Sequence, residues 1–329
     1  MGGTLPLAGK CEMACAPPIT ASVEVYDPKT RKFSPNGSLS EERSGIAALL
    51  LDDGRALVYG GFFDGTIEIY DPAKKASVVV KPPAGMKELP ADATVVKLAD
   101  GRVLIAGGSY DQEASTSNVT LIFDPTGGSF SNGPLMAKPR QGATATLLAD
   151  GRVLIAGGDY YEGYYGHANS NGEVIDPSRP LSRAILLSSL HYPDSSTLLS
   201  DGRVLVAEWG DADSGTGCVA PEVSEVFDPR TETFTPVGPM STPRYQSAAI
   251  KIADGRVVFF GGLDSTCAAI GTAEAFDPDS GTFQAIATGF PKTIDFSATL
   301  LDEGEILIAG GSVSNGQLGV TAATWLLKP

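Results

Sequence analysis

The sequence of 329 residues has only two histidines, two tryptophans, four cysteines and five methionines. It contains no run of 18 apolar residues, so no transmembrane helix is predicted. Lysine and arginine total 24, against 39 aspartate and glutamate residues, which leaves a formal net charge of −15. Nucleic acids and anionic membranes are bound through a basic surface, so this balance predicts neither as a partner.

The motifs of the common catalytic classes are also absent. The chain has no nucleophile elbow, phosphate loop, dinucleotide fingerprint or Cys-x-x-Cys pair, and Asp211-Ala212-Asp213 lacks the following carboxylates of a calcium loop. Met1 is followed by Gly-Gly-Thr-Leu-Pro-Leu, so no signal peptide is visible, and any such peptide would already have been removed. The sequence therefore contains no motif that identifies a catalysed reaction.

The sequence does contain one motif that is repeated six times. It reads Leu-Leu-Ala-Asp-Gly-Arg-Val-Leu-Ile-Ala-Gly-Gly at 147–158 and recurs around six turn glycines, spaced 47, 50, 51, 53 and 49 residues apart. These are Gly54, Gly101, Gly151, Gly202, Gly255 and Gly304. The period is typical of propeller blades, and the Asp-Gly step predicts a tight hairpin between two strands, which we name a and b.

A second repeated motif follows the variable loop after strand b. It is an apolar strand that ends in Asp-Pro, as in Glu-Val-Tyr-Asp-Pro at 24–28. Proline cannot donate to a strand ladder and aspartate closes turns, so Asp-Pro ends a third strand, c. A phenylalanine then opens a fourth strand, d, at Phe33, Phe130, Phe234 and Phe283. Each repeat is therefore predicted to be a four-stranded blade.

These recurring offsets resemble the kelch-repeat family of β-propellers, in the bacterial form whose strand b reads Gly-Arg-Val-Leu-Ile-Ala-Gly-Gly. The resemblance covers nearly the whole chain and implies a single all-β, kelch-type β-propeller domain over 1–329, built from four-stranded antiparallel blades. The fourth repeat departs from the pattern, because Glu208-Trp209 replaces Gly-Gly. The second and fourth repeats also lack the phenylalanine of strand d.

The number of blades depends on the N-terminal segment. Six a–b hairpins are present, and residues 1–36 contribute a further c–d segment. Kelch propellers are usually closed by one blade formed from both termini, so the resemblance favours six blades with 1–36 as the partial blade that helps to close the ring. Seven blades is the alternative.

The four cysteines bear on the compartment. Cys218 and Cys267 each lie ten residues before the aspartate of the next Asp-Pro, and Cys11 and Cys15 lie in the N-terminal counterpart of that loop. An even count in loops predicts disulfides and an extracellular or periplasmic location. We prefer the pairs Cys11–Cys15 and Cys218–Cys267; four free thiols in a cytoplasmic protein is the alternative.

In a propeller the variable b–c and d–a loops share one face, where binding residues are expected. Just before strand a, at this face, stand Arg43, Arg140, His191 and Arg244. In kelch adaptors that bind acidic peptides, arginines at similar positions line the peptide site. That resemblance applies to the three arginines of this chain and predicts a positive patch for an anionic ligand. Alternatively, the arginines bond carbonyl groups or carboxylates of their own blades.

The third and fourth repeats have the richest loops. The third b–c loop, 159–167, holds four tyrosines and His167, and the fourth repeat adds His191-Tyr192 and Glu208-Trp209. Aromatic side chains offer a large contact area with a polar tip, which suits a sugar or an aromatic ring. The full predicted ligand-binding set is Arg43, Arg140, Tyr164, His167, His191, Tyr192, Glu208, Trp209, Asp211, Arg244 and Tyr245.

Two functions from different classes follow. The first is a non-catalytic, monomeric binding module without cofactor or metal, whose partner is a protein, peptide or saccharide. The second is an enzyme, a metal-dependent oxidoreductase or lyase, that uses His191, Glu208 and nearby tyrosines, with His167 and Asp211 as further metal ligands. The fold of galactose oxidase is similar, but this chain lacks that family's flanking domains and a second histidine near its C-terminus.

Overall fold

The computed structural model describes residues 19–61, 64–110, 116–162, 165–169, 171–179, 181, 183–186, 192–209, 224–286, 289–314, 318–320 and 323–329. The regular elements in these ranges are all β-strands. The described part contains no helix that could cross a membrane. Contacts divide the chain into two compact units, the first chiefly Cys15–Asn169 with Glu173–Ala184 and the second chiefly Ile185–Pro329.

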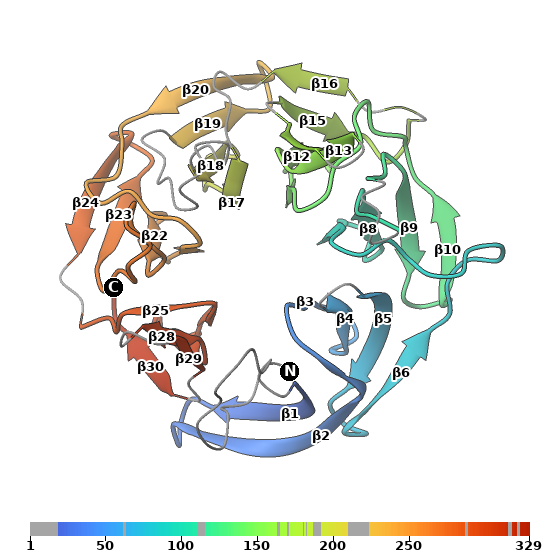
Figure 1. Cartoon of the computed structure of the whole chain (residues 1–329), viewed down its shortest axis with the longest axis horizontal. Helices are drawn as coiled ribbons and strands as arrows, with labels where there is room; N and C mark the ends of the chain where they lie inside the picture. Colours follow the sequence, from blue (N-terminus) through green and yellow to red (C-terminus); the bar gives the residue numbers. More distant parts are fainter. Residues whose placement is uncertain are drawn as a thin grey trace. The chain divides into compact units, whose positions relative to one another are not determined.

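The first unit contains blades 1 to 3, several of whose strands are labelled in Figure 1. Blade 1 has β3 to β6, and β1 and β2 join its sheet through one parallel bridge between β2 and β6. Blade 2 has β7 to β10, and blade 3 has β11, β12, β15 and β16 with the separate hairpin β13–β14. The strands are β1 Thr20–Asp27, β2 Lys32–Arg43, β3 Ala47–Leu50, β4 Ala56–Gly61, β5 Asp64–Asp71, β6 Ala76–Val80, β7 Thr94–Lys97, β8 Val103–Ala106, β9 Thr120–Asp124, β10 Ser129–Asn132, β11 Thr144–Leu147, β12 Val153–Ala156, β13 Asp159–Glu162, β14 Tyr165–Ala168, β15 Asn171–Ile175 and β16 Arg183–Leu186.

The second unit contains blades 4 to 6. Blade 4 has β17 to β20, blade 5 has β21 to β24, and blade 6 has β26, β27 and β30 with a small sheet of β25, β28 and β29. The strands are β17 Tyr192–Leu198, β18 Val204–Trp209, β19 Ser224–Asp228, β20 Thr233–Val237, β21 Ala248–Lys251, β22 Val257–Phe260, β23 Ala273–Asp277, β24 Thr282–Ile286, β25 Thr293–Ile294, β26 Ser297–Leu300, β27 Ile306–Ala309, β28 Ser312–Ser314, β29 Leu318–Val320 and β30 Thr324–Leu327. The fold class is a six-bladed β-propeller, so the predicted all-β architecture with six blades is confirmed.

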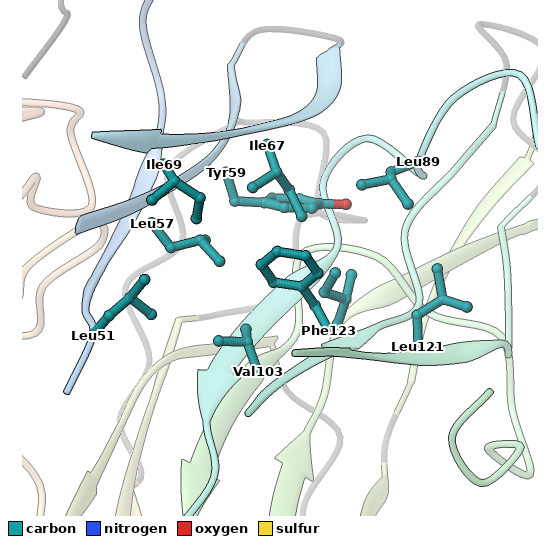
Figure 2. Close-up of a cluster of buried hydrophobic side chains, with 10 residues drawn as sticks. Leu51, Leu57, Tyr59, Ile67, Ile69, Leu89, Val103, Leu121 and Phe123 are labelled. Carbon is teal, nitrogen blue, oxygen red and sulfur yellow. The ribbon is translucent and has the colours of Figure 1, made fainter. Parts of the chain in front are cut away.

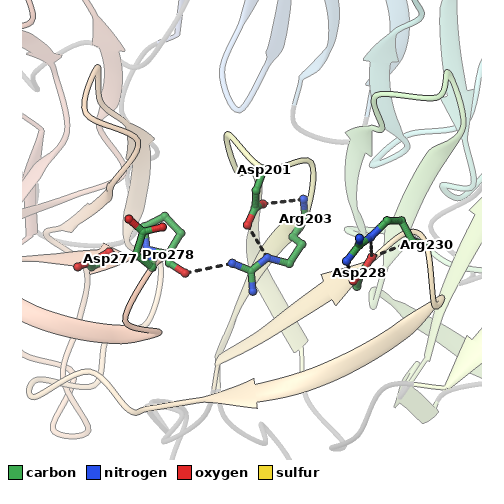
Figure 3. A network of polar contacts seen from close by, with 7 residues as sticks. Asp201, Arg203, Asp228, Arg230, Asp277 and Pro278 are labelled. Atoms are coloured by element: carbon green, nitrogen blue, oxygen red, sulfur yellow. Dashed lines mark hydrogen bonds and ion pairs between the residues drawn. The ribbon is translucent and has the colours of Figure 1, made fainter.

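The repeated Asp-Gly-Arg turns explain how neighbouring blades are joined. In blade 4 Asp201 accepts hydrogen bonds from the backbone N–H and Nε of Arg203, at 3.0 and 2.6 Å (Figure 3). Arg203 Nη2 donates a hydrogen bond to the carbonyl oxygen of Pro278, in the Asp-Pro motif of blade 5, at 3.0 Å. Arg55 does the same to Pro125 across blades 1 and 2, at 3.1 Å. The Asp-Gly-Arg turn of one blade and the Asp-Pro motif of the next therefore hold these adjacent blades together.

The phenylalanines that open strand d pack on aromatic residues of strand c. Phe130 lies opposite Phe123 in the β9–β10 ladder, with ring centroids 4.8 Å apart. Phe227–Phe234 and Phe276–Phe283 repeat the arrangement at 4.9 and 5.1 Å. Aromatic pairs of this kind stabilise an antiparallel ladder beyond their buried area.

The hydrophobic core lies between blades because both faces of strands b and c are buried. Leu57 and Tyr59 of β4 pack with Val103 and Phe123 of blade 2 (Figure 2). Val58, between them in the strand, points to the opposite face and packs with Val23 and Leu39 of β1 and β2 and with Tyr70. Successive side chains of a strand alternate between faces, so the N-terminal pair of strands covers blade 1 as a neighbouring blade would.

One predicted disulfide residue lies in the described part. Cys267, at positive φ in the b–c loop of blade 5, is disulfide-bonded. Cys11, Cys15 and Cys218 lie outside the described residues, so the pairing Cys218–Cys267 stays a prediction, as does ring closure by 1–36.

Candidate functional site

Backbone pairing brings the d–a and b–c connections of a blade to one end, which we call the loop end. Isolated antiparallel bridges join Ala91 to Ser109 in blade 2, Gln141 to Asp159 in blade 3, and Tyr245 to Leu263 in blade 5. The first partner lies before strand a and the second directly after strand b. Variable loops and strand-a entries therefore share one end in each of these blades.

Arg140, one of the predicted ligand-binding residues, is completely buried. Its Nη2 forms an ion pair with Glu173 Oε1 on β15 at 2.5 Å, and its Nη1 donates to the carbonyl oxygen of Gly157. Glu173 in turn accepts from the backbone N–H groups of Ala137 and Lys138, at 2.7 and 3.0 Å. We call this set of one arginine, one glutamate and one glycine carbonyl the arginine clamp.

Blades 1 and 5 contain the same clamp. Arg43 Nε lies 2.8 Å from Glu68 Oε1, and its Nη1 donates to Gly60 O at 2.9 Å. Arg244 Nη2 lies 3.1 Å from Glu274 Oε1, and its Nη1 donates to Gly261 O at 3.2 Å. Each guanidinium group thus joins the strand-a entry to strands b and c of its own blade.

Burial and pairing act in opposite directions on these charges. Burial lowers the pKa of Arg140 and Arg244, while their glutamate partners raise it. Burial also raises the pKa of Glu274, but hydrogen bonds from Ser241, Thr242 and Arg244 outweigh it, and the net shift is downward. The carboxylate is therefore held in its ionised form, as a buried ion pair requires.

The predicted arginine patch is not present as an open surface. Arg43, Arg140 and Arg244 have exposed fractions of 2 %, 0 % and 2 %. Their donors are directed at carboxylates and carbonyl groups inside the blades because burying an unpaired charge would cost several kcal/mol. The alternative interpretation of these arginines, as residues that bond within their blades, is the one that the geometry supports.

Blade 4 departs from the others at its Gly-Gly position. A Cβ on the second glycine would lie 2.6 Å from Gln141 O at Gly158 and 2.5 Å from Tyr245 O at Gly262, so a side chain cannot fit there. In blade 4, β18 instead continues in the ladder through Glu208 and Trp209, which pair with Pro193 and Tyr192. Both glycine positions of that blade are thus remodelled into extended strand.

The third b–c loop forms the hairpin β13–β14. Tyr160 lies opposite His167, and their rings stack with centroids 5.3 Å apart and an interplanar angle of 30°. His167 is exposed and Tyr160 is half-buried. The Tyr161 backbone N–H donates to Thr116 Oγ1, in the b–c loop of blade 2, at 3.2 Å. The hairpin therefore presents a stacked aromatic pair and rests on the adjacent blade.

Two carboxylates lie at the base of this hairpin. Burial, together with repulsion from Asp92, raises the pKa of Asp159, although hydrogen bonds from its own backbone and from Gln141 oppose the shift. Burial raises the pKa of Asp92, which has positive φ and accepts from the Gly142 N–H at its carbonyl oxygen, at 3.0 Å. Two partly buried carboxylates that repel each other therefore lie close together at the loop ends of blades 2 and 3.

The remaining predicted site residues are less fully described. Tyr164, His191 and Asp211 lie outside the described residues. Tyr192, Glu208 and Trp209 are placed by strand pairing alone. Tyr245 is half-buried and pairs through its backbone with Leu263. Within the described ranges, no group of three or more histidine, cysteine, aspartate or glutamate side chains is arranged to hold a metal ion.

The sequence-based set omitted Asp92, Gln141 and Asp159. Their signal was available, because Asp92 and Gln141 lie two and three residues before strand a of their blades, and Asp159 directly follows Gly-Gly in the tyrosine-rich loop. The prediction was based instead on the arginines that precede Gln141 and its counterparts by one residue.

Comparison with known proteins shows the fold. No family model and no curated protein matches the sequence. A solved structure of a fungal alcohol oxidase of the AA5 family, in complex with copper, superposes with a TM-score of 0.69 at 16 % identity. The match covers 94 % of this chain and 67 % of the oxidase. The chain is thus similar in fold to that oxidase.

Proposed function

We propose that this protein is a non-catalytic binding module, a propeller of the kelch type, whose ligand is a neutral or basic saccharide held at the loop ends of blades 2 and 3. The observation that carries the proposal is the stacked Tyr160–His167 pair beside Asp159. Aromatic rings offer a flat apolar surface for a sugar ring, and carboxylate and amide groups accept and donate hydrogen bonds to hydroxyls.

The charges at this end favour such a ligand over an anionic one. Asp92 and Asp159 already repel each other, and a sulfate or carboxylate would add to that repulsion. The arginines that an anionic ligand needs are engaged in the clamps. A basic group, by contrast, would relieve the repulsion between the two aspartates.

A glycan array tests the proposal with the full chain. We expect binding to neutral or amino sugars, no preference for sulfated glycans, and loss of the signal in Tyr160→Ala. Tyr26→Ala is the matched control, because Tyr26 is also half-buried and paired with an aromatic residue, Phe33, at 5.0 Å. Binding confined to sulfated or carboxylated glycans, or an unchanged signal in Tyr160→Ala, would reject the proposal.

An oxidoreductase is the second candidate, supported by the fold shared with the copper-containing alcohol oxidase and by the remodelled loop end of blade 4. Its residues would be His191, Glu208 and nearby tyrosines. Elemental analysis after dialysis against copper distinguishes the two candidates. One tightly held copper per chain, lost in His191→Ala, would favour the oxidoreductase, and no retained copper would remove the copper-dependent version.

A further inference from the structure

The first strand, β1, has the sequence of a strand c. Residues 23–27 read Val-Glu-Val-Tyr-Asp and are followed by proline, as the Ser-Glu-Val-Phe-Asp of β19 is. The aspartate also has the same register, because Asp27 lies opposite Lys32, the first residue of β2, as Asp228 lies opposite Thr233, the first residue of β20. β1 and β2 therefore correspond to strands c and d of a blade.

β1 lacks the neighbour that strand c has in the six blades. In each blade strand c lies between strand d or the sheet edge on one side and strand b on the other, as β19 lies between β18 and β20. Among the described strands, β1 pairs with β2 alone and ends its six-stranded sheet. Blade 6 has a strand c of its own, β30, which pairs with β27. One edge of β1 is therefore open in the described part of the chain.

Side chains of β1 are exposed where those of a strand c are otherwise buried. Val25 is 45 % exposed, whereas Val226, at the same position of β19, is 4 % exposed. Tyr26 is half-buried and its counterpart Phe227 is completely buried. Val23, by contrast, is buried in a cluster with residues of blade 1. β1 is thus anchored on blade 1 but leaves an apolar strand edge exposed, which is a template for pairing with another chain.

Glu24 on β1 occupies the position of a clamp glutamate. It lies three residues before the aspartate of Asp-Pro, as do Glu68, Glu173 and Glu274 of the three arginine clamps. Those three are buried with their arginines, whereas Glu24 is exposed and has no ion pair among the described residues. A carboxylate covered by strand b needs a cation, because a buried unpaired charge is costly. β1 therefore keeps the residue that meets the arginine of a complete blade.

We propose that the open edge of β1 binds an a–b hairpin of a different protein, which completes a blade with β1 and β2 by strand addition. The hairpin carries an arginine before its first strand, which pairs with Glu24, and an apolar second strand, which covers Val25. A second arginine follows its Asp-Gly turn and faces Asp27, as Arg256 is attracted to Asp277 in blade 5.

This chain does not itself supply such a hairpin. The six a–b hairpins of a second copy each belong to the sheet of their own blade and already pair with a strand c there. Residues 1–18 contain neither arginine nor an Asp-Gly step. The net charge of −15 also opposes association of two copies and favours a partner that brings cations to Glu24 and Asp27. The partner is therefore a separate polypeptide with a basic, strand-forming hairpin.

A synthetic peptide with the sequence of residues 140–158 contains both arginines, the Asp-Gly turn and the apolar strand, and serves as the probe. We expect it to bind the full chain saturably in titration calorimetry and to slow hydrogen exchange at the backbone amides of β1. Glu24→Gln and Val25→Lys should each weaken binding about tenfold or more. Glu88→Gln and Val78→Lys change exposed side chains elsewhere in the first unit and are the matched controls, which should bind the peptide as the wild type does.

A second peptide tests the clamp itself. Leucine in place of the first arginine of the peptide should weaken binding to the wild type but have little further effect on Glu24→Gln, because the two changes remove the same ion pair. Equal losses in both backgrounds, no saturable binding, or exchange protection confined to strands other than β1 would overturn the proposal. Glu24 and Val25 are exposed, so both variants should keep the Tm of the wild type. The saccharide site does not enter this test.

Discussion

Arg140 and Glu173 are both completely buried and form an ion pair of 2.5 Å that links the entry of strand a to strand c of blade 3. The pair bridges 33 residues of sequence and includes no atom at the surface. The pair therefore holds the blade together from inside and offers no hydrogen-bond donor at the surface.

Breaking this clamp should be costly. Arg140→Leu leaves Glu173 buried without its cation, and removing one partner of a buried pair costs about 3–5 kcal/mol. Arg140→Leu with Glu173→Leu should recover part of that loss, because Leu121 of blade 2 stands, like Glu173, three residues before the aspartate of Asp-Pro and is a buried leucine. Urea unfolding measures both. Arg179→Leu, at a side chain 74 % exposed, is the control and should change stability by less than about 0.5 kcal/mol.

The contact between Arg203 and Pro278 predicts a smaller effect. Arg203→Gln removes a part-buried hydrogen bond between blades 4 and 5 and should cost about 1 kcal/mol in the free energy of unfolding. Arg230→Gln is matched in chemistry, because Arg230 also pairs with an aspartate, Asp228, but its side chain is 85 % exposed. Equal losses in the two variants would show that the link between blades contributes nothing.

Two glycines with similar backbone conformation allow the cost of backbone strain to be distinguished from the cost of a steric collision. Gly202 and Gly262 have φ of +88° and +85°, but a Cβ at Gly202 would meet nothing within 4 Å, whereas one at Gly262 would lie 2.5 Å from Tyr245 O. Gly202→Ala should cost about 1 kcal/mol from backbone strain alone. Gly262→Ala should lower Tm clearly more. Similar Tm values would contradict the assignment of Gly-Gly to close backbone approach.

The raised pKa values predict that Asp92→Asn stabilises the protein at neutral pH. An aspartate whose folded pKa is raised favours the fold below its unfolded pKa and opposes it as the pH rises through the folded value. Asparagine removes that penalty and also tolerates the positive φ of this position. Tm at pH 7 should rise and the gain should fade towards pH 3. A gain that is equal at both pH values would show that charge is not its cause.

The blade pattern could be read from the sequence because turn glycines and Asp-Pro act locally. Gly101 and Asp124 form their turns with residues two to four positions away, so the repeat reveals them directly. The destination of Arg140 could not be read in that way, because its partner Glu173 is set by strand order. Likewise, the convergence of Asp92 and Asp159 depends on how two neighbouring blades pack.

The most direct test of the proposed function is the affinity of the best-bound array glycan for matched variants, measured by titration calorimetry. We expect Tyr160→Ala to weaken binding about tenfold or more, equivalent to about 1.4 kcal/mol, and Tyr26→Ala to leave it unchanged. Equal affinities for the wild type and Tyr160→Ala would show that the hairpin β13–β14 is not the binding element.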